Sequence, residues 1–328
     1  MKILIILDPL QKLFLDWDTS LFLVSELLKR GHRVWGADVP DIWAESSQSF
    51  ACAAEFRVSE KPRLRLSAEI GPVPTLSLSA PSIAYLEDFN LIVIRKEPPF
   101  DAAYYYLTLL LDRISHKVAV SNRASGIRNT NEKMATLLFP DFIPPTIVSS
   151  NISAILEFQR SRRCPLIVKP LNEKGGTGII LLPYKHAKHS NLIQHLKRMT
   201  QGGHTPVLAQ VFLRSESRKG DKRLLVLDGK ILAGYQKKPP RNDFRSNLSI
   251  GGTFHEARIT PHDEKLAAAM KPYLHDQGIH FTGLDVMAGK LLDFNVTCPA
   301  GLTEAKVLYP RLGLVEAWVD FLERLQPS

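Results

Sequence analysis

The chain has 328 residues, a length that suits two or three domains. Its content of 45% hydrophobic and 23% charged residues excludes global disorder, a coiled coil and a collagen-like rod. The formal net charge of +9 is compatible with an anionic partner, which could be a nucleic acid, a membrane surface, a nucleotide or an acidic metabolite, although a charged surface that only keeps the protein in solution is the default explanation. No segment approaches the ~20 apolar residues of a membrane span, so we expect a soluble protein.

The cysteines are Cys52, Cys164 and Cys298, which are odd in number and far apart. They form no CxxC pair, so neither a disulfide framework nor a structural zinc site is favoured. This usage fits a reducing compartment, and we predict a cytoplasmic protein.

The first part of the chain predicts a parallel sheet. Residues 3–7 form an aliphatic run typical of a strand buried on both faces, and residues 19–30 carry apolar side chains at helical spacing. Gly31 then ends the helix, and residues 32–37 resemble a second strand. This strand–helix–strand order predicts a right-handed βαβ unit and a Rossmann-like domain. Residues 91–94 continue the sheet as a further strand.

Two further segments complete this half of the chain. Residues 102–115 predict a helix. Residues 59–83 contain four prolines and many serines, with weak periodicity, so they predict a loop or irregular excursion.

The second half of the chain predicts short strands joined by tight turns. Residues 166–170 and 179–182 flank a glycine-bearing loop, which predicts a hairpin whose tip can close on a ligand. Residues 206–213 predict a single strand. Residues 223–233 predict two strands joined at Asp228-Gly229, and residues 283–295 predict a hairpin that turns at Ala288-Gly289.

The last hairpin carries oxygen ligands. Asp293 and Asn295 are two residues apart and therefore share one face of their strand, to which Asp285 can point from the opposite strand. Carboxylate and amide oxygens suit Mg²⁺. The pattern is equally compatible with solvent-facing residues near a turn.

Two lysines and a glycine loop are candidates for binding phosphate. Lys169 ends an apolar strand, where a charge is unusual unless an anion meets it, and Lys133 stands at the start of a short predicted helix. Each lysine taken alone is more typical of a surface residue. The loop at 175–178 is neither a Walker A motif nor a GxGxxG motif.

Taken in order, these features resemble the bacterial glutathione synthetases of the ATP-grasp superfamily, over nearly the whole chain. The segments that carry the resemblance are LDP (7–9), DTS (18–20), IRKEPPFD (94–101), NEK (131–133), VKPL (168–171), GDKR (220–223), RSNLSIGG (245–252), GLD (283–285) and NVT (295–297). The resemblance implies an α/β and α+β ATP-grasp fold in three parts. These are a Rossmann-like domain at 1–122, a lid subdomain at 123–205 and a C-terminal subdomain with an antiparallel sheet at 206–328.

The resemblance also implies roles in binding ATP. Lys133 and Lys169 would hold the α- and β-phosphates, and Gly175 and Gly176 would let the lid backbone approach the triphosphate. Asp221 would bind the ribose hydroxyls. The hinge would pair with adenine through its backbone, and it consists of Gln210, Val211, Phe212 and Leu213.

The remaining implied roles concern the metal and the peptide. Mg²⁺ or Mn²⁺ would be held by Asp285, Asp293 and Asn295. Arg223 and Arg245 would be catalytic and would contact the peptide and its acyl phosphate. The peptide end of the site would be completed by Asp18, Ser20, Arg95, Gly251 and Gly252.

The implied reaction joins γ-glutamylcysteine to glycine with ATP through an acyl phosphate, and releases glutathione, ADP and phosphate. The implied setting is a cytoplasmic homo-oligomer without a nucleic-acid or membrane partner. An anionic nucleotide and an acidic dipeptide account for part of the positive charge.

Three departures from the family pattern leave alternatives open. Asp293 replaces a usual Glu, and Asn172 replaces a usual Asp in the lid loop. The segment VTCPAGLTE (296–304) lacks two hydroxyls and an arginine of the family pattern, through Cys298, Ala300 and Thr303. The alternatives are a related carboxylate–amine ligase for another peptide or amino acid, and a non-catalytic protein that binds ATP or a peptide.

Overall fold

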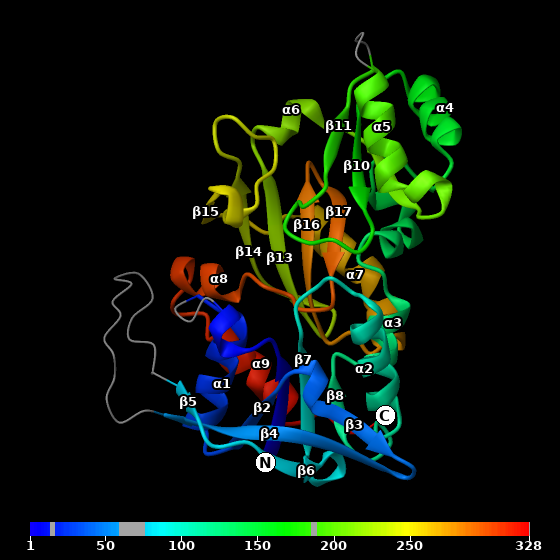
Figure 1. Cartoon of the computed structure of the whole chain (residues 1–328). Coiled ribbons are helices and arrows are strands. Elements are labelled where there is room, and N and C mark those ends of the chain that lie inside the picture. Colours follow the sequence, from blue (N-terminus) through cyan, green and yellow to red (C-terminus); the bar gives the residue numbers. More distant parts are fainter. Residues whose placement is uncertain (14–16, 59–75, 185–188, 328) are drawn as a thin grey trace.

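The computed structural model describes residues 1–13, 17–58, 76–184 and 189–327. Three sheets follow one another along the molecule (Figure 1). The first lies at the end where both termini are found, a four-stranded sheet lies at the opposite end, and a five-stranded sheet lies between them.

The first sheet combines parallel and antiparallel strands. Its order is β3 (Ile42–Glu45), β4 (Gln48–Val58), β2 (Arg33–Ala37), β1 (Lys2–Leu7), β7 (Leu91–Arg95) and β8 (Ala119–Ser121). The pairs β1–β2, β1–β7 and β7–β8 are parallel, which confirms the predicted parallel sheet. The antiparallel strand β4 also pairs with β5 (Leu76–Leu78) and β6 (Ser82–Tyr85). The prediction of a loop was therefore wrong for the last residues of 59–83, and residues 59–75 lie outside the described chain.

Both faces of the first sheet are covered by helices (Figure 1). The alternation of β1 sends Ile3 and Ile5 into a core shared with α1 (Thr19–Lys29) and α9 (Leu314–Leu322). Leu4 and Ile6 point into a second core, which includes α2 (Ala102–Asp112) and α3 (Ala124–Asn129). All four side chains are fully buried, which explains the unbroken aliphatic run.

The four-stranded sheet forms the lid end. Its antiparallel order is β11 (Ile180–Leu182), β10 (Leu166–Pro170), β12 (Val207–Val211) and β9 (Thr146–Ser149). The helices α4 (Ile152–Arg162) and α5 (His189–Met199) cover one face, where Val168 and Ala209 pack with Ile155 and Leu196. The strand β12 belongs to this sheet, although the predicted boundary at 205/206 assigns it to the C-terminal part. The three-domain division itself stays a prediction.

The five-stranded sheet is antiparallel throughout. Its order is β15 (Thr253–Glu256), β14 (Lys230–Lys238), β13 (Asp221–Leu227), β16 (Phe281–Met287) and β17 (Lys290–Asn295). The turns at Asp228-Gly229 and Ala288-Gly289 have positive φ at both residues, as two-residue hairpins of type I′ require, and both predicted hairpins are confirmed. The helices nearby are α7 (Pro261–Asp276) and α8 (Leu302–Leu308).

The remaining helical segments are short. The α-helical one is α6 (Arg214–Ser217). The 3₁₀ segments are Leu10–Lys12, Val39–Asp41, Leu86–Asp88, Met134–Leu138, Pro140–Phe142, Gln201–Gly203 and Leu248–Ile250. In the described ranges, no helix is long and apolar enough to cross a membrane.

Asn122 joins the first sheet to the five-stranded sheet. Its amide nitrogen donates to the carbonyl oxygens of Phe281 at 2.8 Å and Val296 at 2.9 Å. Its amide oxygen accepts from the backbone N–H groups of His280 and Phe281, both at 2.8 Å. The side chain is buried, so these bonds satisfy its amide inside the protein. They fix the start of β16 and the end of β17 against the first sheet.

Candidate active site

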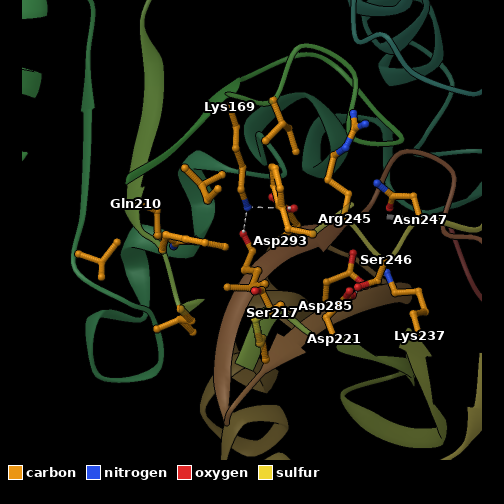
Figure 2. A pocket seen from close by; sticks show the side chains of 18 residues that line it. Lys169, Gln210, Ser217, Asp221, Lys237, Arg245, Ser246, Asn247, Asp285 and Asp293 are labelled. Atoms are coloured by element: carbon orange, nitrogen blue, oxygen red, sulfur yellow. Dashed lines mark hydrogen bonds and ion pairs between the residues drawn. The ribbon is translucent and has the colours of Figure 1, made fainter. Parts of the chain in front are cut away.

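A cavity lies between the four-stranded and five-stranded sheets, and Figure 2 shows the side chains that line it. Many of the residues expected to bind ATP or metal meet there, although they come from distant parts of the chain. The expected residues in the lining are Lys169, Gln210, Val211, Phe212, Leu213, Asp221, Arg245, Asp285 and Asp293. The juxtaposition supports one binding site built from both sheets.

Lys169 reaches the cavity because of the alternation of β10. Leu166 and Val168 point into the lid core, so Ile167 and Lys169 point the other way. The Lys169 side chain is buried, and its Nζ donates to the carbonyl oxygen of Leu292 at 3.1 Å and to Oδ2 of Asp293 at 3.2 Å (Figure 2). The ammonium therefore spans the cavity from the lid to β17.

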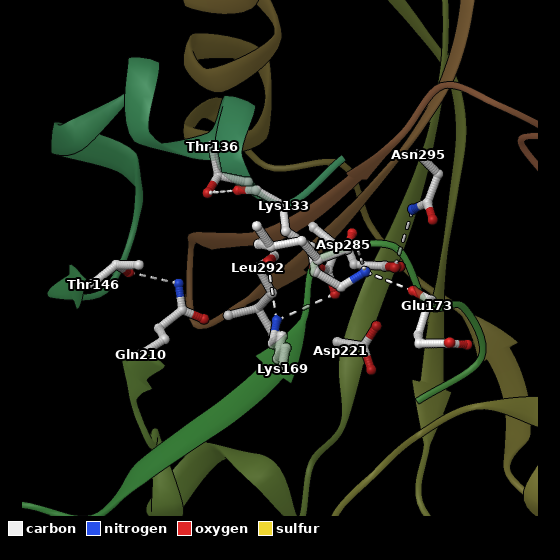
Figure 3. A network of polar contacts seen from close by, with 12 residues as sticks. Lys133, Thr136, Thr146, Lys169, Glu173, Gln210, Asp221, Asp285, Leu292 and Asn295 are labelled. Atoms are coloured by element: carbon white, nitrogen blue, oxygen red, sulfur yellow. Dashed lines mark hydrogen bonds and ion pairs between the residues drawn. The ribbon is translucent and has the colours of Figure 1, made fainter. Parts of the chain in front are cut away.

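Lys133 lies beneath the lid loop instead of in the cavity wall. It directly precedes the 3₁₀ segment Met134–Leu138. Its Nζ donates to the carbonyl oxygens of Glu173 at 2.6 Å and Leu171 at 3.4 Å, and Figure 3 shows the first of these contacts. The lysine thus contacts the backbone of the loop that was expected to approach the phosphates.

The expected metal ligands come together on β16 and β17. Asp285 lies directly opposite Asp293 in the strand register, and Gly283 lies opposite Asn295. The Asn295 Nδ2 donates to Oδ2 of Asp285 at 3.3 Å (Figure 3). Asp293 Oδ1 is buried and has no hydrogen-bond partner among the described residues. A buried carboxylate oxygen without a partner, facing a second carboxylate, fits a divalent cation.

The side chains that could bind a metal ion here offer oxygen donors of two kinds, carboxylate and amide. In the part of the chain that the structure describes, no group of three or more His, Cys, Asp or Glu side chains could hold a metal ion. The site therefore offers two carboxylates and the amide of Asn295, which are ligands for a hard cation that takes its other ligands from phosphate or water.

Cations surround Asp285. Arg223 donates to both carboxylate oxygens, with Nε at 2.9 Å and Nη2 at 3.1 Å, and Lys237 Nζ lies 2.8 Å from Oδ1. Burial alone would raise the pKa of Asp285, but the charges of Arg223 and Lys237 hold that pKa well below its usual range. Asp285 is therefore an ionised buried carboxylate.

Arg223 has the space it needs because residue 283 is glycine. A Cβ on Gly283 would lie 2.8 Å from Arg223 Nη1 and 3.2 Å from its Cδ. The guanidinium also donates to the carbonyl oxygen of Ala300 at 2.8 Å, so it connects the carboxylate pair with the segment after β17.

Lys237 is a further site residue, although it was not among the expected ligands. Its buried ammonium bridges Asp221 at 2.7 Å and Asp285 at 2.8 Å. Burial raises the pKa of Asp221, and the charge of Lys237 opposes that shift. The alternation of β14 could have indicated its position. Ala233, Tyr235 and Lys237 lie on the same, buried face of this strand, whereas Lys238 is exposed.

Arg245 belongs to the loop between β14 and β15 and closes against the lid. Its Nη1 donates to the carbonyl oxygen of Gly176 at 3.2 Å, and its Nη2 donates to Asp243 Oδ2 at 2.7 Å. Those hydrogen bonds from Arg245 lower the pKa of Asp243 to about 2. Gly176 has a φ of +80°, and a Cβ there would lie 2.5 Å from Nδ2 of Asn247. This glycine therefore allows the contact between the two loops.

The other expected glycines shape these loops without lining the cavity. Gly175 has a φ of +62° at the tip of the lid loop. Gly251 has a φ of +92° with open space around it, whereas a Cβ on Gly252 would lie 2.5 Å from the carbonyl oxygen of Ser246.

Part of the hinge backbone is hydrogen-bonded to other residues of the protein. The Val211 N–H donates to Pro145 at 3.0 Å, and the Phe212 N–H donates to Pro165 at 2.9 Å. The Gln210 side chain donates to Thr146 Oγ1 at 2.9 Å (Figure 3). Within the described ranges the N–H of Leu213 has no backbone acceptor, so it is the hinge donor left for a ligand.

The residues expected at the peptide end of the site lie close together, but they are hydrogen-bonded to one another and to the protein backbone. Asp18 caps α1 by accepting from the N–H of Ser20 at 2.7 Å. Arg95 donates to Ser20 Oγ at 3.0 Å and to the carbonyl oxygen of Pro299 at 3.0 Å. Arg95 is 3% exposed and Ser20 is 2% exposed, so both hold the segment after β17 against the first sheet. Burial raises the pKa of the Cys298 thiol well above its usual value, which makes it a poor nucleophile.

Comparisons with known proteins cover both halves of the chain. Residues 1–128 match the model of the prokaryotic glutathione synthetase N-terminal domain, and residues 132–309 match that of the prokaryotic glutathione synthetase ATP-grasp domain. A protein of Thermosynechococcus vestitus named glutathione synthetase is 34% identical over 322 residues, which are 97% of this chain and 99% of the relative. A protein of Gloeobacter violaceus with the same name is 35% identical over 94% of this chain and 92% of the relative.

Solved structures support the same fold. D-cycloserine synthetase DcsG superposes with a TM-score of 0.65 at 16% identity, over 98% of this chain and 99% of that chain. D-alanyl-alanine synthetase A from Vibrio cholerae superposes with a TM-score of 0.58 at 12% identity, over 99% of this chain and 98% of that chain. Together with the match to the ATP-grasp domain model, these similarities confirm the predicted ATP-grasp fold.

Proposed function

The chain belongs to the prokaryotic glutathione synthetase family and is an ATP-dependent ligase that makes glutathione; we propose that it joins γ-glutamylcysteine to glycine through an acyl phosphate in the cavity between the two antiparallel sheets. The observation that carries the proposal is the composition of the cavity wall. A lysine from the lid, a hinge strand and a pair of carboxylates from the five-stranded sheet all line the same space.

The apolar part of the cavity suits the adenine base. The cavity is lined by Ile167 and Ile179 from the lid and by Met287 and Leu292 from the five-stranded sheet. A flat aromatic ring gains hydrophobic burial between such side chains. The N–H of Leu213 is then placed to donate to a ring nitrogen of the base.

The polar part of the cavity suits ribose and phosphates. Asp221 lines the cavity beside Ser246, and its carboxylate would accept from the ribose hydroxyls. Lys169 would exchange its contact with Asp293 for a phosphate oxygen. Lys133 would reach the α- or β-phosphate from beneath the lid loop, once the loop carbonyls that it holds at 2.6 Å and 3.4 Å release it.

The carboxylate pair would hold the divalent metal on which ATP-grasp ligases depend. We propose Mg²⁺, with Mn²⁺ as its substitute, bound by Asp285, Asp293 and Asn295. A bound cation of this kind neutralises phosphate charge during phosphoryl transfer. Asp293 contributes the buried Oδ1 that has no partner among the described residues, and its shorter side chain relative to Glu is compatible with this role.

A free carboxylate resists attack by an amine, because its leaving group would be oxide. In the first step, the dipeptide carboxylate attacks the γ-phosphorus and the bond to ADP breaks. The glycine amine then attacks the acyl carbon, phosphate leaves with the electron pair of the carbon–oxygen bond, and the amine loses a proton. Arg223 and Arg245 would stabilise the negative charge in both steps. The contact of Arg245 with Gly176 keeps the lid loop closed, which excludes water from the acyl phosphate.

The peptide would lie toward the first sheet. Arg223 connects Asp285 with Ala300, and Arg95 connects Pro299 with Ser20. We propose that Asp18, Ser20 and Arg95 form the wall at the peptide end, and that Gly251 and Gly252 shape the loop that covers it. Cys298 and Thr303 are buried in this wall. The Thr303 hydroxyl donates to the carbonyl oxygen of Trp17 at 3.0 Å, so it is used within the chain.

Phosphate release tests the reaction directly. The enzyme is assayed with ATP and a panel of dipeptide and amino-acid pairs, and turnover restricted to γ-glutamylcysteine with glycine is the expected result. Turnover only with another pair would contradict the proposed substrates. ATP binding without turnover on any pair would contradict the ligase activity.

Lys169→Ala tests the proposed cavity. We expect a loss of turnover of about a hundredfold or more in a variant that still folds, because a charge aimed at the phosphates is removed. The midpoint of unfolding should fall, because Asp293 loses the cation that pairs with it. Lys230→Ala is the matched control, since Lys230 is exposed on β14 and lies outside the cavity lining. Wild-type turnover in Lys169→Ala would refute the phosphate contact.

Three finer assignments complete the proposal. We propose a cytoplasmic enzyme, in agreement with the free thiols of Cys52, Cys164 and Cys298. We also propose a homo-oligomer that acts on small molecules and has no nucleic-acid partner. Sedimentation of the purified protein measures the oligomeric state.

A further inference from the structure

A second cavity of about 800 Å³ adjoins the first one and is rich in arginine. Arg214 and Arg218 reach it from α6 and the residue after it, and Arg241 reaches it from the loop between β14 and β15. These two segments lie at the same end of the molecule (Figure 1). We call these three residues the rim arginines. None of them belongs to the catalytic machinery described above.

The rim arginines are not neutralised by carboxylates of this cavity. Its described lining contains one carboxylate, Asp243, whose two oxygens are bound by Arg245 at 2.7 Å and 3.1 Å. Glu216 lies on α6 between Arg214 and Arg218, but it pairs with Lys219 at 3.0 Å. The cavity therefore carries an excess of positive charge at its rim.

The arginines of α4 show what an ordinary surface cluster looks like. Arg160 pairs with Glu157 at 2.5 Å, and Arg162 stacks on Phe158 with its guanidinium 5.4 Å from the ring. They lie on a helix face, whereas the rim arginines converge on a hollow from two separate segments. This difference favours a ligand for the rim arginines.

The second cavity adjoins the first, and the two share part of their lining. Both cavities are lined by Ile179, Ser217 and Arg245, and also by Phe212 and Phe244. The two phenyl rings contact each other edge to face, with centroids 5.6 Å apart. Phe244 belongs to the same loop as Arg241, so this loop lines both cavities.

We propose that the second cavity is a capture site for the triphosphate of the incoming nucleotide. This inference rests on the proposed function only in taking that nucleotide to be ATP. Guanidinium groups bind phosphate oxygens through paired N–H donors, and exposed arginines bind them weakly enough to release them. ATP carries more negative charge than the dipeptide, and glycine carries no net charge. The nucleotide is therefore the substrate that this rim would attract most strongly.

The test removes the rim charges and compares two triple variants. Arg214→Gln/Arg218→Gln/Arg241→Gln is compared with Arg160→Gln/Arg162→Gln/Arg163→Gln, which changes the net charge by the same amount in the last turn of α4 and the residue that follows it. At low ionic strength we expect kcat/KM for ATP to fall about tenfold in the rim variant, with kcat at saturating ATP and the KM for glycine unchanged. At about 0.5 M salt the defect should disappear, because screening suppresses charge steering. The α4 variant should behave like the wild type.

Several outcomes would overturn the proposal. Equal defects in both triple variants would mean that net charge alone attracts the nucleotide. A raised KM for γ-glutamylcysteine with unchanged kinetics for ATP would assign the cavity to the acidic peptide. Calorimetric titration with ATP separates this inference from the proposed function. Weaker ATP binding by the rim variant alone would support capture even if the wild type ligated no peptide, whereas equal affinities at low salt would refute capture.

Discussion

Replacing Lys237 by methionine should damage the site and the five-stranded sheet together. The substitution keeps an unbranched side chain of similar length and removes one buried charge that contacts Asp221 at 2.7 Å and Asp285 at 2.8 Å. Asp285 would keep the two bonds from Arg223, whereas Asp221 would lose the one cation that pairs with it among the described residues. The variant therefore leaves one buried carboxylate without a cation.

The expected loss of unfolding free energy follows from these contacts. Removing one partner of a buried ion pair costs about 3–5 kcal/mol, because the other charge stays buried without compensation. We expect about 3 kcal/mol, at the lower end of this range, since Asp285 keeps its pair with Arg223 and Asp221 alone loses the cation that pairs with it in the described ranges. Turnover should also fall, because Asp221 and Asp285 both line the nucleotide cavity.

Urea denaturation measures the stability, and phosphate release measures the turnover. Lys222→Met is the matched control: Lys222 pairs with buried Asp263 at 2.6 Å on the same sheet, outside the cavity lining. Asp263 keeps hydrogen bonds from the N–H and hydroxyl of Thr260, both at 2.8 Å. Lys222→Met should therefore cost less stability than Lys237→Met and should leave turnover at the wild-type level.

A second variant tests the cause of the destabilisation. Adding Asp221→Asn to Lys237→Met removes the stranded charge, and it should restore at least half of the lost unfolding free energy without restoring turnover. A loss below about 1 kcal/mol in Lys237→Met, or no recovery in the double variant, would refute the argument that Lys237 compensates Asp221.

Three further predictions test other parts of the molecule. Asp293→Glu should retain or increase turnover with Mg²⁺ if the carboxylate pair holds the metal, whereas complete loss of turnover would show a different local geometry. Gly176→Ala should raise the KM for ATP several-fold, because the new Cβ would lie 2.5 Å from Nδ2 of Asn247. Gly202→Ala is the control for backbone strain alone, since Gly202 has a φ of +70° and open space around it, and it should leave the KM unchanged. Burial lowers the pKa of His280 from 6.5 to about 4, so the folded state resists protonation that the unfolded state accepts. The unfolding free energy should therefore fall by at most about 3 kcal/mol as the pH falls from 6.5 to 4, and His280→Gln should flatten this dependence in urea titrations at each pH.

Local patterns in the sequence predicted much of the fold. The aliphatic run of β1 indicated a strand buried on both faces, and the turn pairs at 228–229 and 288–289 indicated hairpins. Strand patterns and turn pairs depend on neighbours within a few residues, which the sequence displays directly. The register set by the turn alone would place Asp285 opposite Leu292. A β-bulge between Asp285 and Val286 shifts the register by one residue and brings Asp285 opposite Asp293, which the sequence did not show.

Longer-range pairing was not visible in the sequence. The prolines near β5 and β6 suggested a loop, yet both strands pair with β4 because that strand continues past β2 and offers them an edge. The strand β12 joins the lid sheet, where it pairs with β9 and β10, and these pairings join segments that lie about 40 to 60 residues apart in the chain.

For the site, the residue types and their order could be predicted from the sequence: Lys169 at the end of an apolar strand, a glycine loop, and two carboxylates on the two strands of a hairpin. The pairing of the charges depended on how distant segments pack. The tertiary structure buried Lys237 between Asp221 and Asp285, and it bonded Arg95 within the chain. The physical reason is that the partner of a buried charge is set by the packing of segments distant in the chain, whereas a turn or an alternating strand is set by adjacent residues.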